Sequence, residues 1–315
     1  MGGGSIVEMA SMNDEEANCL KPLVELIFLR LSNSISPSFS QSFVKKVIVT
    51  GDFPSTMEEL SELNGHPITY TNDEYAHCVA KVEPVKIEGS TGVVIVLNKD
   101  FSRLLLSESD DDVNAFIHMM HHELGHVYDF ETKFRHLADD LARSDYSAKE
   151  KYLFGYADRM WSEYFANRYS AATASNQDIA RHAQILSNAL SLAMDAIDQA
   201  NREFSHSRNG DVLLDSYQLH AGRIMTSMAY VAGYCDGLSI PLGELIPLLH
   251  DNIKAAGLES GWCDFSEALS DMAQTHSEWE GISAFRNLTY KIEEFLSDLG
   301  LVLGESDQGI YVKVH

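Results

Sequence analysis

The residues best suited to chemistry are two histidines four positions apart, with a glutamate beside the first. They form the string HELGH at residues 122–126, which matches the HExxH pattern. Two imidazoles at this spacing lie on one face of a helix and can bind a single zinc ion. A glutamate beside the first ligand can accept a proton from zinc-activated water and later pass it to the leaving amine. We therefore predict that His122 and His126 are zinc ligands and that Glu123 is the catalytic base.

A helix must hold these residues, and the sequence predicts one that begins near Asp110. The acidic residues there favour the positive end of a helix dipole. At 100° per residue, the histidines share a face with His118 and Asp129. The opposite face carries an apolar stripe that we expect to pack against a sheet, formed by Val113, Ile117, Met120, Leu124 and Val127. Burial of this stripe would hold the ligand face rigidly.

The polar neighbours of the two ligands have alternative interpretations. Asp129, one turn past His126, either accepts an imidazole N–H and so fixes the tautomer, or is a solvated carboxylate at a helix end. His118 either hydrogen-bonds within the cleft or is a structural histidine with its hydrogen bonds satisfied, and the second interpretation is favoured. His121 lies off the ligand face, and we expect it to be a partly exposed polar residue.

A catalytic zinc needs a third protein ligand and an open fourth position. The metzincin pattern would require a histidine at position 132, where the chain has Thr132. The next strong candidate is Glu163, in a predicted helix over residues 147–171. Its separation of 37 residues from His126 leaves room for a loop and an antiparallel return. Tyr156 lies seven residues before Glu163, which is two helical turns, so the two share a face.

Two strings, HELGHVYD and SEYFANRY, resemble the HExGHxxD and ExFA(E/N) segments of the anthrax-lethal-factor-like and Pro-Pro endopeptidase group of gluzincins. The resemblance covers residues 90–175, and Asn167 stands where many relatives carry an acidic residue. It implies that Glu163 is the third zinc ligand and that Tyr156 donates a hydrogen bond to the developing oxyanion. HELGH is also similar to a segment of the phage-repressor-cleaving metallopeptidases of the antitoxin type. An alternative donor is His220, in a segment with spacing similar to thermolysin-like enzymes.

The pattern of elements predicts an α+β fold. Helices are expected at residues 16–32 and 56–63 and strands at 43–53, 77–87, 92–101 and 309–315, with long helices from Asp110 onward. We predict a zincin-like catalytic domain over residues 1–175 and a mostly helical C-terminal lobe over 176–315. The apolar run Val93–Leu97 is either an edge strand that binds substrate by strand addition or a central strand buried on both faces.

The charge of the chain is strongly acidic, with 47 Asp and Glu against 23 Lys and Arg and a net charge of −24. Such a surface repels phosphate backbones and anionic lipids, so we expect neither nucleic-acid nor membrane partners. The four cysteines have no paired spacing and predict reduced, mostly buried thiols. With no recognisable secretory signal, these thiols favour a cytoplasmic location.

Two functions agree with these features. The first is a zinc-dependent endopeptidase that hydrolyses a peptide or protein substrate with metal-activated water. The second is a zincin-fold regulatory or protein-binding module with little or no turnover. Glu123 favours the first, because a structural zinc site gains nothing from a base beside its ligand. The acidic helical lobe favours the second.

Overall fold

The computed structural model describes residues 6–35, 39–68, 70, 78–87, 89–141, 146–307 and 309–314. The chain divides into two compact units. The first, here called the sheet unit, comprises Met1–Glu131 and Thr173–Ser175, and the second, the helical unit, comprises Thr132–Ala172 and Asn176–His315. This division differs from the boundary expected at residue 175, because the end of the HExxH helix and the whole of the helix with Glu163 pack with the later helices.

The sheet unit contains a mixed sheet with strand order β1-β2-β4-β3. β1 (Val7–Ala10), β2 (Val44–Thr50) and β4 (Ser90–Asn98) are parallel, whereas β3 (Ala80–Ile87) runs antiparallel to β4. β4 is therefore an internal strand, and its run from Val93 to Leu97 is buried on both faces. Of the two interpretations of this run, the central strand is correct, and the edges of this sheet are β1 and β3.

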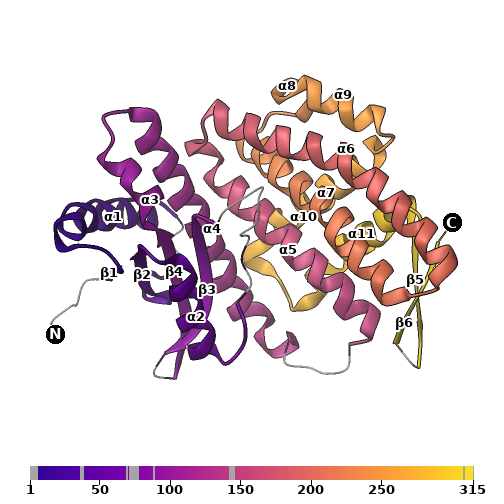
Figure 1. The fold of residues 1–315 in the computed structure, drawn as a ribbon, viewed down its shortest axis with the longest axis horizontal. Coiled ribbons are helices and arrows are strands. Elements are labelled where there is room, and N and C mark those ends of the chain that lie inside the picture. Colours follow the sequence, from indigo (N-terminus) through magenta and orange to yellow (C-terminus); the bar gives the residue numbers. More distant parts are fainter. Residues whose placement is uncertain are drawn as a thin grey trace. The chain divides into compact units, whose positions relative to one another are not determined.

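Helices cover both faces of this sheet (Figure 1). One core lies between the sheet and the helices α1 (Asp14–Ser34) and α4 (Asp110–Leu141), and it includes Val24, Phe28, Val47, Ile95 and Leu124. The other lies between the sheet and α2 (Phe53–Asn64), and it includes Ile48, Met57, Leu60, Val94 and Val96. The alternation of side chains along β4 supplies both cores.

The expected elements of this unit are present with shifted ends. The helix expected at 16–32 is α1, the one at 56–63 is α2, and the strands at 43–53, 77–87 and 92–101 are β2, β3 and β4. No element was predicted at β1, which has only four residues. Short helical turns connect β2 and β4 to the longer elements: η1 (Gln41–Phe43), α3 (Lys99–Ser102) and η2 (Arg103–Leu106).

The helical unit is built on three long helices, α5 (Ala148–Ser170), α6 (Asn176–Ser207) and α7 (Gly210–Leu238). α7 packs against both α5 and α6. The remaining elements are η3 (Ala171–Thr173, ending in the sheet unit), α8 (Leu242–Leu245), α9 (Pro247–Ala255), α10 (Glu259–Gln274), η4 (His276–Glu278), η5 (Ile282–Phe285), α11 (Arg286–Asp298), β5 (Leu301–Ser306) and β6 (Gly309–Val314). β6 is the strand expected at the C-terminus, and it pairs antiparallel with the unpredicted β5.

Glycines on α7 bring its backbone against that of α5. A Cβ atom on Gly233 would lie 2.5 Å from the carbonyl oxygen of Tyr164, and one on Gly237 would lie 2.4 Å from that of Arg168. Both distances are shorter than non-bonded atoms tolerate. The two helices therefore approach each other only because these positions lack side chains.

The four cysteines agree with expectation in forming no disulfide bond but not in their burial. The four cysteines are free, as predicted, but Cys19 and Cys263 are exposed and Cys78 and Cys235 are partly exposed, so the expectation of mostly buried thiols is wrong.

Within the described ranges, every helix is too short or too polar to span a lipid bilayer.

Candidate metal centre

α4 carries the HExxH pattern and begins at Asp110, as predicted. Its apolar stripe is only partly as expected. Met120, Leu124 and Val127 are fully buried, but Phe116 occupies the first buried turn in place of Ile117, which is partly exposed. Phe116 lies four residues before Met120 and packs against Phe101 with 6.3 Å between ring centroids. At 100° per residue, Phe116 lies about 40° from Met120 in helical phase and Ile117 about 60° away on the other side, so Phe116 is the nearer of the two to the buried stripe.

The two predicted histidine ligands project together from this helix. The Nε2 atoms of His122 and His126 lie 3.0 Å apart, and their rings meet edge to face with 4.7 Å between centroids. Both side chains are partly exposed. One helix therefore places two ligand nitrogens at a separation suitable for a shared cation.

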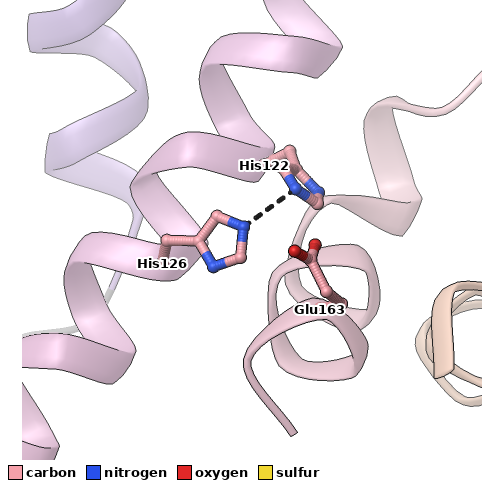
Figure 2. A group of neighbouring side chains, drawn as sticks. All are labelled: His122, His126 and Glu163. Carbon is pink, nitrogen blue, oxygen red and sulfur yellow. Dashed lines mark hydrogen bonds between the residues drawn. The ribbon is translucent and has the colours of Figure 1, made fainter. Parts of the chain in front are cut away.

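Glu163 lies on α5, whose start is fixed by reciprocal hydrogen bonds. The Glu150 amide donates to Ser147 Oγ at 3.2 Å, and the Ser147 amide donates to Glu150 Oε2 at 2.8 Å. One carboxylate oxygen of Glu163 and one nitrogen of each histidine all lie within 4.8 Å of one another. In Figure 2 the three side chains point toward a common centre. The structure thus brings together the three residues predicted as ligands.

The donor set could hold a metal ion, and its chemistry is compatible with zinc. Tetrahedral zinc with bonds of about 2.0–2.1 Å separates its ligand atoms by roughly 3.4 Å, and the three ligand atoms here lie within 4.8 Å of one another. Two imidazoles and a carboxylate are a ligand set used by catalytic zinc. Among the described residues, no further histidine, cysteine, aspartate or glutamate joins this group. Three protein ligands leave one coordination position for water or substrate.

Two acidic residues of α4 flank the ligands and are buried. Glu123 is 7% exposed and Asp129 is fully buried. Asp129 is also far from a helix end, since α4 continues to Leu141. The interpretation of Asp129 as a solvated helix-end carboxylate is therefore wrong.

His118 and His121 share one hydroxyl partner. The Nδ1 atoms of His118 and His121 lie 3.2 Å and 3.1 Å from Thr173 Oγ1, and all three groups belong to the sheet unit. His118 is thus a buried histidine with a structural hydrogen bond, as favoured. The expectation that His121 is partly exposed is wrong, and its burial lowers its pKa to about 4 because desolvation disfavours the imidazolium.

Tyr156 is a buried residue of α5 and lies beside α7. A Cβ atom built on Gly222 would lie 3.6 Å from the Tyr156 ring, which is ordinary van der Waals contact. The Tyr156 hydroxyl lies 3.4 Å from that of Tyr152, one turn earlier on α5. Burial raises the pKa of Tyr156 well above its ordinary value, so the phenol keeps its proton. Tyr152 was not singled out from the sequence, although its spacing of four residues from Tyr156 was a signal that it could contact the phenol.

Two other residues considered in the sequence have defined surroundings. His220 is partly exposed on α7 and does not belong to the group formed by His122, His126 and Glu163. Asn167 is buried, and its Nδ2 atom donates to the backbone carbonyl of Tyr230 at 3.1 Å. This amide therefore helps to hold α5 against α7, a bond that a carboxylate at position 167 could not donate.

Comparison with known proteins adds no assignment to this geometry: no protein-family model, curated protein or solved structure matches the chain.

Proposed function

We propose that this chain is a zinc-dependent endopeptidase of the gluzincin type, with His122, His126 and Glu163 as metal ligands. The observation that supports this most directly is the convergence of their ligand atoms to within 4.8 Å of one another. A structural zinc site fills all four positions with protein ligands, whereas three ligands of this kind are typical of catalysis.

Zinc held by these groups would lower the pKa of a bound water toward neutrality and polarise the carbonyl of the scissile peptide bond. The chain itself must then move a proton. Glu123 follows His122 directly in the sequence, and its carboxylate accepts the proton of the attacking water and delivers it to the nitrogen of the departing amine.

Tyr156 is the proposed donor to the oxygen that gains negative charge. It lies two turns before Glu163 on α5, on the same face, and its phenol remains protonated because it is buried. A neutral hydroxyl at this place can donate a hydrogen bond throughout the neutral pH range. Asp129, buried one turn beyond His126, is proposed to accept an imidazole N–H and fix the tautomer.

Replacement of Glu123 by Gln tests the proposal, because the amide keeps the shape of the side chain but cannot accept the proton. We expect zinc content to remain near one ion per chain and hydrolysis of a diverse peptide library to fall by about 10²- to 10⁴-fold. Glu108→Gln, at an exposed position before α4, is the matched control and should retain full activity.

Two results would contradict the proposal. If the Glu123→Gln protein and the wild type cleave peptides equally, then Glu123 is not a catalytic base. If both bind zinc and neither cleaves any peptide, the interpretation as a zincin-fold binding module replaces that of an endopeptidase.

A further inference from the structure

The proposed catalytic tyrosine has a second tyrosine as its neighbour. Tyr152 and Tyr156 stand one turn apart on α5, with 5.3 Å between ring centroids, an angle of 64° between the rings and 3.4 Å between the hydroxyl oxygens. Both rings belong to the helical unit. Both contacts depend on the rotamers that the two side chains take.

The surroundings restrict how the Tyr156 ring can move. The ring lies against the backbone of α7 at Gly222, and only 5% of the residue is exposed. Tyr152 closes the side toward the start of α5. A rotation of Tyr156 about its side-chain bonds would separate the two hydroxyls, so a hydrogen bond between them favours the observed position of the Tyr156 oxygen.

We propose that Tyr152 is a positioning residue for Tyr156, and that its hydroxyl donates to the Tyr156 oxygen. This inference rests on the proposed function. Either hydroxyl can donate in such a pair, but only one direction leaves the Tyr156 proton for the substrate. When Tyr152 donates, Tyr156 accepts through an oxygen lone pair and directs its own O–H at the carbonyl oxygen of the scissile bond.

Both hydroxyls have a proton available for donation. Burial raises the pKa of Tyr152 as well as that of Tyr156, so each keeps its proton at neutral pH. Donation by a neighbouring hydroxyl also makes the accepting O–H a stronger donor, because hydrogen bonds in a chain polarise one another. Tyr152 would therefore set both the place and the donor strength of the Tyr156 hydroxyl.

A double-mutant cycle in the full-length, zinc-loaded protein tests the inference. We expect Tyr156→Phe to lower kcat by about 10²- to 10³-fold, as the loss of one oxyanion donor does. Tyr152→Phe should lower kcat by about three- to tenfold with little change in KM, as expected for the loss of one neutral hydrogen bond. The double variant should be no slower than Tyr156→Phe alone, because Tyr152 acts only through Tyr156.

A matched control and a spectroscopic measurement complete the design. Tyr290→Phe removes a hydroxyl from an exposed tyrosine of α11 and should leave kcat unchanged. In protein labelled with ¹³C at the tyrosine ζ carbon, Tyr152→Phe should shift the Tyr156 resonance, whereas Tyr290→Phe should not. This readout does not depend on turnover.

The outcomes separate the inference from the proposed function. The inference is overturned if the two losses multiply in the double variant, if Tyr152→Phe has full kcat, or if the Tyr156 resonance is unchanged. In each of these cases a dependence of hydrolysis on Glu123 would leave the proposed function standing. A zinc-loaded wild type that cleaves no peptide would refute the proposed function and, with it, the positioning role of Tyr152.

Discussion

In the sheet unit, large apolar side chains hold α4 in place. In the helical unit, α5 packs closely against α7 because two residues of α7 are glycines. Phe116, Met120 and Leu124 fill the core beneath α4 and are fully buried. On α7, Gly233 and Gly237 allow direct contact with the α5 backbone. A helix that carries a candidate ligand can therefore be fixed either by apolar burial or by close backbone approach, and different substitutions disrupt the two kinds of packing.

Removal of the largest side chain beneath α4 should have the greatest effect. Phe116→Ala is expected to destabilise the sheet unit by about 3–5 kcal/mol, because it removes buried apolar surface and leaves a cavity. Hydrogen exchange measured peptide by peptide should show faster exchange in α4 and the sheet. Ile117→Ala, at the partly exposed neighbouring position, is the control and should cost clearly less. Equal losses would mean that the stripe at Phe116 does not anchor α4.

Addition of a single methyl group tests the other kind of packing. Gly233→Ala should destabilise the helical unit by about 1–3 kcal/mol, because the new Cβ atom would overlap the Tyr164 carbonyl. Gly155→Ala is the matched control, since its Cβ atom would meet nothing within 4 Å, and it should stabilise α5 by roughly 0.5–1 kcal/mol. Denaturant unfolding monitored by hydrogen exchange measures both. A neutral Gly233→Ala would contradict the need for close approach.

The next prediction concerns a hydrogen-bonding hydroxyl, that of Thr173, rather than an apolar contact. Thr173→Val keeps the shape of the side chain but leaves the Nδ1 atoms of His118 and His121 without this partner. We expect the sheet unit to lose about 2 kcal/mol of stability, since a buried polar group deprived of its hydrogen bond costs about 1–3 kcal/mol. Thr173→Ser retains the hydroxyl and should keep most of the wild-type stability. Thermal unfolding of the three proteins measures this. Equal melting temperatures for the valine variant and the wild type would refute this role.

The smallest expected effect concerns a buried phenol of the helical unit. The Tyr217 hydroxyl donates to the carbonyl of Leu299 at 2.7 Å, and Tyr217→Phe should cost about 1 kcal/mol at pH 7. Burial raises the pKa of Tyr217 to about 12, so the folded state keeps a proton that the unfolded state releases above about pH 10. The stability that the protonated Tyr217 contributes to the folded state is therefore present below pH 10 and is lost as the pH rises to 12.

Unfolding by urea between pH 8 and pH 12 measures this pH dependence. The wild type should lose stability more steeply than Tyr217→Phe above pH 10. Identical slopes for the two proteins would show that Tyr217 does not contribute to the alkaline decline.

Local patterns in the sequence were sufficient to predict the helix with the two histidines and the strand β4. The spacing of His122 and His126 follows from the helix repeat, and the acidic start at Asp110 gave the correct first residue of α4. The apolar run of β4 predicted a strand, because β-branched residues favour extended backbone. These features depend on residues close together in the chain, so periodicity and capping preferences are sufficient to predict them.

Tertiary structure decided the remainder, because it depends on contacts between distant segments. Only the pairing of β4 with both β2 and β3 showed that its run is internal. The burial of His121 depends on Thr173, 52 residues later, and the close packing of α5 depends on glycines of α7. The helix repeat placed two imidazoles on one face, and a predicted helix and a family resemblance made Glu163 a candidate. Only the folded chain, however, shows its carboxylate within 4.8 Å of their nitrogens.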